Sequence, residues 1–123
     1  MLQIDRRVFG SQGEGIVLRL NGDVDEESTR ELRMSLVDCL KDGNSNIVLN
    51  LTKMKFISYM GIGVFVERLR QFRNYSGDMK LVGVNLYTER LFRMTGVTSL
   101  FDYYDNEQEA IDAYLQNYKP VSK

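Results

Sequence analysis

Histidine is absent from this 123-residue sequence, and cysteine and proline occur once each. The absence of histidine removes the commonest general base and the commonest metal ligand of proteins. The lone Cys39 excludes an internal disulfide and a cysteine-rich zinc site, and no imidazole exists that could activate it as a nucleophile. In its helical stretch we expect it to be a half-buried, inert thiol. We therefore predict that the protein is not an enzyme and that it holds no metal ion or cofactor.

Motifs for binding phosphates and for entering membranes are also missing. No Gly-x-x-x-x-Gly-Lys-Ser/Thr motif is present, and Gly61-Ile62-Gly63 is only a fragment of a dinucleotide fingerprint. The charge-free stretch 57–66 has ten residues, which is far too short to span a bilayer. The first residues lack the apolar region of a signal peptide. We expect a cytoplasmic protein that does not insert into membranes.

The charges nearly cancel, but they are unevenly distributed. The formal net charge is −1, so the whole molecule has no electrostatic attraction to nucleic acid. Residues 21–45 hold seven acids and three bases, whereas residues 53–93 hold eight bases and three acids. We interpret both segments as solvated helix faces. A weaker alternative, nucleotide or nucleic-acid binding without a recognisable base-reading element, would use Arg68, Arg70, Arg73, Arg90 and Arg93.

The spacing of apolar residues predicts a regular alternation of strands and helices. Residues two apart share a face of a strand, as Ile16 and Leu18 do, whereas residues three or four apart share a face of a helix. Either Asp25 or Ser28 can cap the first helix. The expected strands are 15–20, 47–51, 79–84 and 100–104. The first expected helix runs from the cap to residue 40, and the others cover 61–73, 87–95 and 107–118. We expect a turn at 21–23 and a connecting loop at 52–59.

This alternation predicts an α/β fold in a single domain. The first nine residues can pair with 15–20 as a hairpin, which would make the central sheet mixed. The sheet would then have about five strands, and about four helices would pack against it. We expect the domain to cover residues 1–118 and residues 119–123 to form a flexible C-terminal tail.

Several segments form a recognisable pattern around the apolar strand 47–51. This strand is followed by Phe56-Ile57-Ser58-Tyr59-Met60-Gly61-Ile62-Gly63, and it is preceded by the turn 20–25. Downstream, Leu91-Phe92-Arg93-Met94-Thr95-Gly96-Val97 precedes Leu100-Phe101. In this order and spacing the segments resemble the STAS domain family, whose central strand leads into a helix that opens with an Asp-Ser-Ser/Thr-Gly-Leu-Gly type sequence. The resemblance extends from residue 4 to residue 115.

The resemblance implies a regulatory binding module of the anti-sigma factor antagonist type. In such antagonists, the partner phosphorylates the serine or threonine just before the motif glycine, and the added charge and bulk release the complex. The unmodified form binds the partner, an anti-sigma factor or related GHKL-type kinase, and thereby frees the sigma factor. Transcription is thus regulated by partner switching. A PP2C-type phosphatase is a further partner that the resemblance implies.

The sequence departs from the family pattern at the phosphorylation site. With Gly61 aligned to the motif glycine, Met60 occupies the usual site, Tyr59 the preceding residue and Ser58 the aspartate position. Either the chain binds its partner constitutively, with Met60 and Tyr59 as an adaptable apolar contact, or phosphorylation has moved to Ser58 or Tyr59. The residues expected to contact the partner are Asp25, Ser58, Tyr59, Met60, Gly61 and Ile62.

Structural roles can also explain these residues. Gly61 and Gly63 would allow a helix to pack closely on the sheet, Ser58 and Asp25 would be helix caps, and Met60 would belong to the core.

The missing phosphorylation chemistry favours an alternative function for the chain. In that case the chain would be a stressosome-like scaffold or a STAS accessory subunit of a lipid-transport ATPase.

Overall fold

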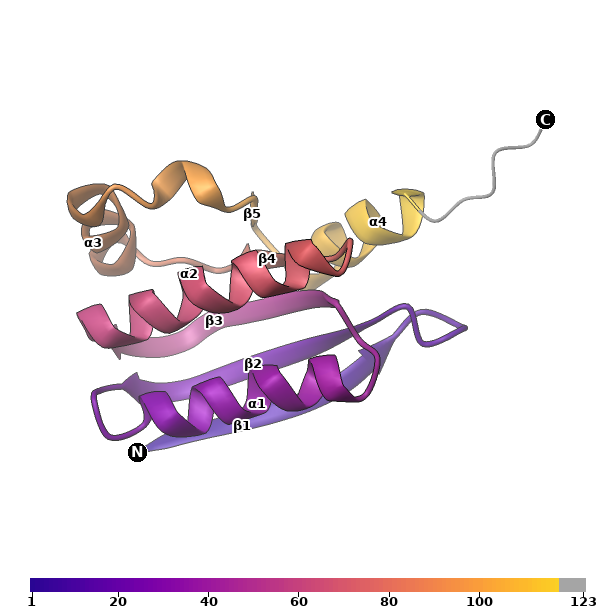
Figure 1. Ribbon diagram of the computed structural model, residues 1–123. Coiled ribbons are helices and arrows are strands. Elements are labelled where there is room, and N and C mark those ends of the chain that lie inside the picture. Colours follow the sequence, from indigo (N-terminus) through magenta and orange to yellow (C-terminus); the bar gives the residue numbers. More distant parts are fainter. Residues whose placement is uncertain (118–123) are drawn as a thin grey trace.

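The computed structural model describes residues 1–117 as a five-stranded mixed sheet with helices on both faces (Figure 1). The strands lie in the order β1-β2-β3-β4-β5; β1 is antiparallel to β2, and every later neighbouring pair is parallel. This confirms the predicted α/β fold, including the N-terminal hairpin. Tyr118 and the predicted tail, 119–123, lie outside the described residues. The elements are β1 (Leu2–Phe9), β2 (Gly15–Val24), α1 (Thr29–Lys41), β3 (Asn46–Ile57), α2 (Tyr59–Asn74), β4 (Asp78–Val82), α3 (Leu86–Thr95), a 3-10 turn η1 (Thr98–Leu100), β5 (Tyr103–Tyr104) and α4 (Glu107–Asn117).

The alternation of side chains along β2 divides the interior into two cores. Ile16, Leu18 and Leu20 face a larger core beneath α1, α2 and α3, as their spacing predicts. Val17, which points to the opposite side, belongs to a smaller core beneath α4. Because successive strand residues point to opposite faces, one strand can serve both layers.

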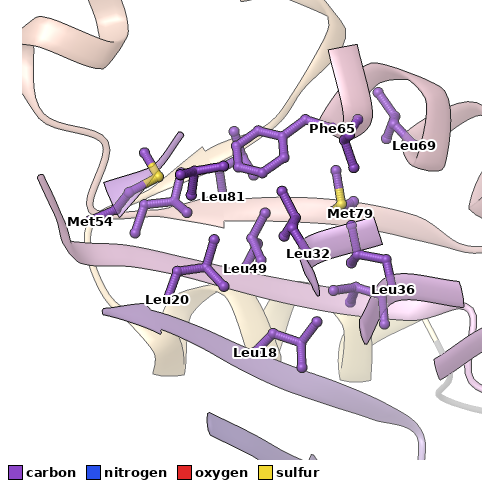
Figure 2. Packing of buried hydrophobic residues seen from close by; sticks show 14 of the residues in the cluster. Leu18, Leu20, Leu32, Leu36, Leu49, Met54, Phe65, Leu69, Met79 and Leu81 are labelled. Atoms are coloured by element: carbon purple, nitrogen blue, oxygen red, sulfur yellow. The ribbon is translucent and has the colours of Figure 1, made fainter. Parts of the chain in front are cut away.

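The larger core fixes α2 on the sheet. Leu32 and Leu36 of α1, Phe65 and Leu69 of α2 and Leu49 of β3 belong to this core (Figure 2). All five side chains are fully buried. Burial of each contributes about 1.5–3 kcal/mol. The middle of α2 is therefore packed on the sheet, and the buried Ile62 extends this packing to the first turn of the helix.

The smaller core is closed by polar contacts that anchor α4. The Tyr114 hydroxyl donates a 2.7 Å hydrogen bond to the carbonyl of Ile47. At the start of α4, the carboxylate of Glu107 accepts two bonds from Arg19, at 2.7 and 2.8 Å, and one from Asn50, at 2.6 Å. These contacts hold α4 at both of its ends.

Two strands are longer than the sequence predicts. β2 continues through the expected turn 21–23 to Val24, and β3 continues through most of the expected loop 52–59 to Ile57. The two strands keep pairing because register shifts between Arg19 and Asn21, and between Gly22 and Asp23, absorb the turn-forming residues as irregularities. The predictions of a turn and a loop at these places were therefore wrong.

Other boundaries also differ from the predicted ones. α2 begins at Tyr59 rather than at Gly61, and β4 ends at Val82. The expected strand 100–104 is reduced to Tyr103–Tyr104, because 98–100 form the 3-10 turn. Cys39 is fully buried rather than half-buried. Gly96 ends α3 as expected, with a left-handed φ of 75°.

Candidate partner-docking surface

The carboxyl ends of β2 and β3 lie side by side and bring the loops before α1 and α2 together. Asp23 pairs with Phe56 and Val24 with Ile57. The backbone N–H of Ser58 donates a 2.8 Å bond to the carbonyl of Val24. The segments of Asp25 and Ser58, which are 33 positions apart in the sequence, are thus adjacent at one edge of the sheet.

Ser58 caps α2, as the structural explanation of this residue requires. Its Oγ accepts a 3.1 Å bond from the backbone N–H of Gly61, and its carbonyl accepts one from Ile62. The backbone N–H groups of Tyr59 and Met60, in the first turn, have no preceding helical carbonyl to bond. They give the tip of this loop a partial positive charge.

Tyr59 and Met60 are exposed side chains on the first turn of α2. Their exposed fractions are 62% and 51%, so Met60 is not a core residue. Ile62 and Gly61, in contrast, are buried. The predicted contact segment 58–62 therefore offers two large apolar side chains to a partner, while Ile62 packs into the larger core.

The two glycines of α2 have different roles. A Cβ on Gly61 would lie 2.8 Å from Cγ1 of both Ile57 and Val24, so this residue allows close packing of the helix on the sheet. Apart from its chain neighbours and the backbone of its own helix, a Cβ on Gly63 would have no atom of the described residues within 4 Å. Packing therefore does not explain Gly63, which leaves the helix backbone bare next to Tyr59 and Met60.

Asp25 stabilises the turn before α1. Its carboxylate accepts bonds from the backbone N–H and the hydroxyl of Ser28, both at 2.9 Å, and these bonds lower the pKa of the Asp25 carboxyl. Ser28 occupies the N-cap position of α1, but its side chain makes no capping bond to the helix. Asp25 is thus explained by local structure, although it lies beside the docking loop.

Exposed apolar residues that sequence reasoning missed lie next to this loop. The rings of Phe56, at the end of β3, and Tyr87, in the first turn of α3, stack with their centroids 6.0 Å apart. Leu86 and Met94 of α3 are also exposed. Phe56 fell in a segment expected to be a loop, where periodicity predicts no orientation. One feature of the sequence could have revealed this surface: Leu86 and Met94 are apolar but lie outside the stripe of buried residues of their helix.

Two of the arginines of the nucleic-acid alternative make contacts within the domain. Arg68 pairs with Glu67 at 3.3 Å, and Arg73 bonds Asp78 at 3.0 Å and the carbonyl of Leu100 at 2.7 Å.

Within residues 1–117, no group of three or more Cys, Asp or Glu side chains is arranged to hold a metal ion. No helix of this part of the chain is long and apolar enough to cross a membrane.

Comparisons with known proteins agree with the fold and identify the family. The STAS domain family model matches residues 6–110. The anti-sigma F factor antagonist of Paenibacillus polymyxa is 29% identical over 97 residues, which cover 78% of this chain and 83% of that protein. An anti-sigma factor antagonist from Mycobacterium paratuberculosis superposes with a TM-score of 0.82 at 16% identity, covering 94% of this chain and 95% of the other. The phosphorylated form of Bacillus SpoIIAA superposes with a TM-score of 0.69 at 22% identity, covering 92% and 98% of the two chains. Because the family model matches most of the chain, the chain belongs to the STAS domain family.

Proposed function

We propose that this protein is a non-catalytic, cytoplasmic anti-sigma factor antagonist that regulates transcription by binding an anti-sigma factor of the GHKL kinase type. The names of its relatives and its membership of the STAS family support this function. The contact surface is the first turn of α2, with Tyr59 and Met60 at its centre and Asp25 beside it. The observation that carries the proposal is the exposure of these two large apolar side chains in the first turn of a helix whose Ile62 is buried in the larger core.

The apolar pair can supply much of the energy of such a contact. Burying a side chain of the size of methionine is worth about 1.5–3 kcal/mol. Interfaces concentrate their affinity in a few central residues of this kind, and tyrosine is enriched among them. The flexible thioether of Met60 can adapt to the partner surface, and the exposed Gly63 lets the partner approach the helix backbone.

The side chains at this surface favour constitutive binding over a phosphorylation switch. Met60 has no hydroxyl that could accept a phosphoryl group. The Ser58 hydroxyl is bonded to the N–H of Gly61 and is half-buried, whereas the ring of Tyr59 is exposed. If a kinase modifies this loop, Tyr59 is the more accessible acceptor, whereas a PP2C-type phosphatase would act only on a phosphorylated Ser58.

The test compares two methionines of nearly equal exposure. The anti-sigma factor that wild-type bait captures from its own cell is purified, and its affinity is measured by calorimetry. Met60→Asp should weaken binding at least tenfold, because it places a charge in the centre of the contact. Met34→Asp, on the outer face of α1 where Met34 is 49% exposed, is the matched control and should bind as wild type. Equal affinity of both variants would refute the proposed surface.

A scaffold or accessory-subunit role is the second candidate, because Met60 removes the usual phosphorylation site. It predicts a different outcome of the same capture experiment. Transporter or scaffold subunits would be recovered in place of a kinase-fold protein, and size-exclusion chromatography would show a large assembly. A monomer that captures a kinase-fold protein would exclude this candidate.

A further inference from the structure

The outward face of α3 is apolar and basic. Leu86 and Met94 are 78% and 68% exposed, and Arg90 lies between them at helical spacing. The side of α3 that packs on the domain carries Thr88 and Phe92, both fully buried. α3 therefore has one face in the core and an opposite face that no described part of the chain covers.

This face is connected to the proposed docking loop through one aromatic pair. Tyr87 stacks on Phe56, both rings are exposed, and Phe56 lies only three positions before Tyr59. The α3 surface, defined as Phe56, Leu86, Tyr87, Arg90, Arg93 and Met94, is thus continuous with the start of α2.

The charges of the α3 surface are available for an external partner. Among residues 1–117, Arg90 makes no ion pair within 4 Å, and Arg93 pairs only with the exposed Glu89 at 3.3 Å. An exposed pair of this kind within one helix contributes little and exchanges readily. The other two acids of residues 53–93 are occupied elsewhere, since Glu67 pairs with Arg33 of α1 and Asp78 with Arg73.

A helix fits this surface better than a strand does. The nearest backbone that could pair with an added strand is the end of β3, which extends beyond β4. There the side chain of Asn85 already donates a 3.2 Å bond to the carbonyl of Met54. The apolar and basic residues of α3 instead repeat at about one helical turn, which matches the side-chain spacing of an amphipathic helix laid against it.

We propose that the α3 surface binds an acidic amphipathic helix of the partner protein. The inference rests on the proposed function in that one partner would contact both the start of α2 and α3. It specifies the partner's chemistry: leucine-like side chains over Leu86 and Met94, and carboxylates facing Arg90 and Arg93. Because residues 21–45, on the α1 side of the loop, are predominantly acidic, the two sides of the docking loop would attract opposite charges of the partner and fix its orientation.

The probe is a fluorescein-labelled, 18-residue helical peptide of leucine and glutamate, compared with its leucine–lysine counterpart by fluorescence anisotropy at low and moderate salt. We expect the acidic peptide to bind wild type at least tenfold more tightly than the basic peptide, and salt to weaken its binding. The double variant Arg90→Glu/Arg93→Glu should lose at least tenfold in affinity. Arg33→Glu, an exposed arginine of α1, is the control and should bind as wild type. Equal binding of the two peptides, or an unchanged affinity of the double variant, would overturn the inference.

The captured anti-sigma factor separates this inference from the proposed function. If Met60→Asp abolishes its binding while Arg90→Glu/Arg93→Glu affects neither the factor nor the peptide, the α3 surface is refuted and the proposed function stands. If the peptide behaves as expected but no anti-sigma factor binds wild type, the proposed function fails and the α3 surface stands. Arg90 and Arg93 are exposed and the side chain of Arg33 is 44% exposed, and unchanged far-UV circular dichroism would verify that the variants are folded.

Discussion

The ammonium nitrogen of Lys80 lies 4.9 Å from the centre of the Tyr114 ring, beneath α4. It also bonds the carboxylates of Asp102 at 3.1 Å and Asp78 at 3.2 Å. Burial alone would lower the pKa of Lys80, but the two carboxylates outweigh burial and raise it. Lys80 thus connects three parts of the fold: β4, the segment before β5, and α4. These contacts explain why a buried cation occupies a position whose volume a methionine side chain could also fill.

Lys80→Met should destabilise the protein by about 2–3 kcal/mol, since it removes two charge-assisted hydrogen bonds and a cation–π contact while it keeps the packing of the stem. Urea denaturation followed by far-UV circular dichroism measures the difference. Lys55→Met, at an exposed position, is the control and should stay within about 0.5 kcal/mol of wild type. A neutral or stabilising effect of Lys80→Met would show that desolvation cancels these contacts.

The Glu107 carboxylate predicts a defined pH dependence of stability. The bonds from Arg19 lower its pKa below the ordinary 4.5, and Asn50 contributes in the same direction. A carboxyl whose folded pKa is lowered stabilises the fold above its unfolded pKa, and this contribution is lost as the pH falls through the folded value. Glu107→Gln should therefore be less stable than wild type at pH 7, and the difference should shrink as the pH falls below about 4.5. Denaturation curves at pH 7 and pH 3.5 would test this, and a difference independent of pH would contradict it.

Cys39 should be unreactive in the folded protein. Burial raises the pKa of its thiol to about 11, and the side chain is fully enclosed in the larger core. At pH 8 the reaction with a disulfide reagent such as DTNB should be slower by at least about 100-fold than in urea-unfolded protein. Comparable rates with and without urea would mean that α1 opens readily from the sheet.

The alternation of apolar residues was sufficient to predict the order of the elements. Ile16 and Leu18 identified the inner face of β2, and Phe65 and Leu69 identified that of α2, because burial imposes the periods of two and of three to four residues. The ends of the elements were predicted less well. Asn21-Gly22-Asp23 has the composition of a turn, yet pairing with β3 keeps this segment in the sheet.

The candidate site could be predicted only in part. The motif around Gly61 singled out the loop of the candidate site, but it did not indicate that Ile62 packs inward while Tyr59 and Met60 are exposed. Which of these side chains face inward depends on where the helix begins. α2 begins at Tyr59, two residues before the predicted start. The exposed aromatic pair beside this loop could not be predicted, since the stacking of Phe56 on Tyr87 depends on how two distant elements meet at the edge of the sheet.

The two glycines of α2 should respond oppositely to alanine. Gly61→Ala adds a methyl group that would lie 2.8 Å from Val24 and Ile57, so it should cost about 1–3 kcal/mol by overpacking. Gly63→Ala meets no neighbour and should raise stability by about 1 kcal/mol, because alanine restricts the unfolded chain and favours the helix. Thermal and urea denaturation of both variants measure these effects. Stabilisation by Gly61→Ala would show that the helix can shift away from the sheet.

A large side chain at Gly63 separates stability from partner binding. Gly61→Arg would disturb the core, so a loss of binding in that variant could reflect unfolding. Gly63→Arg has free space in the isolated protein, and its fold should persist with unfolding unchanged to within about 1 kcal/mol. If the partner approaches the backbone beside Tyr59 and Met60, the arginine side chain blocks the approach, and affinity for the captured anti-sigma factor should fall at least tenfold in calorimetry.

The control for this variant must introduce arginine without disturbing the fold. Gly43→Arg, at an exposed glycine after α1, is unsuitable because its φ of 86° would add strain. Glu67→Arg, exposed one turn further along α2, introduces the same side chain and should bind within about threefold of wild type if the contact is confined to the first turn. An equal loss in both variants would mean that the charge of the helix face, rather than access to its backbone, controls binding.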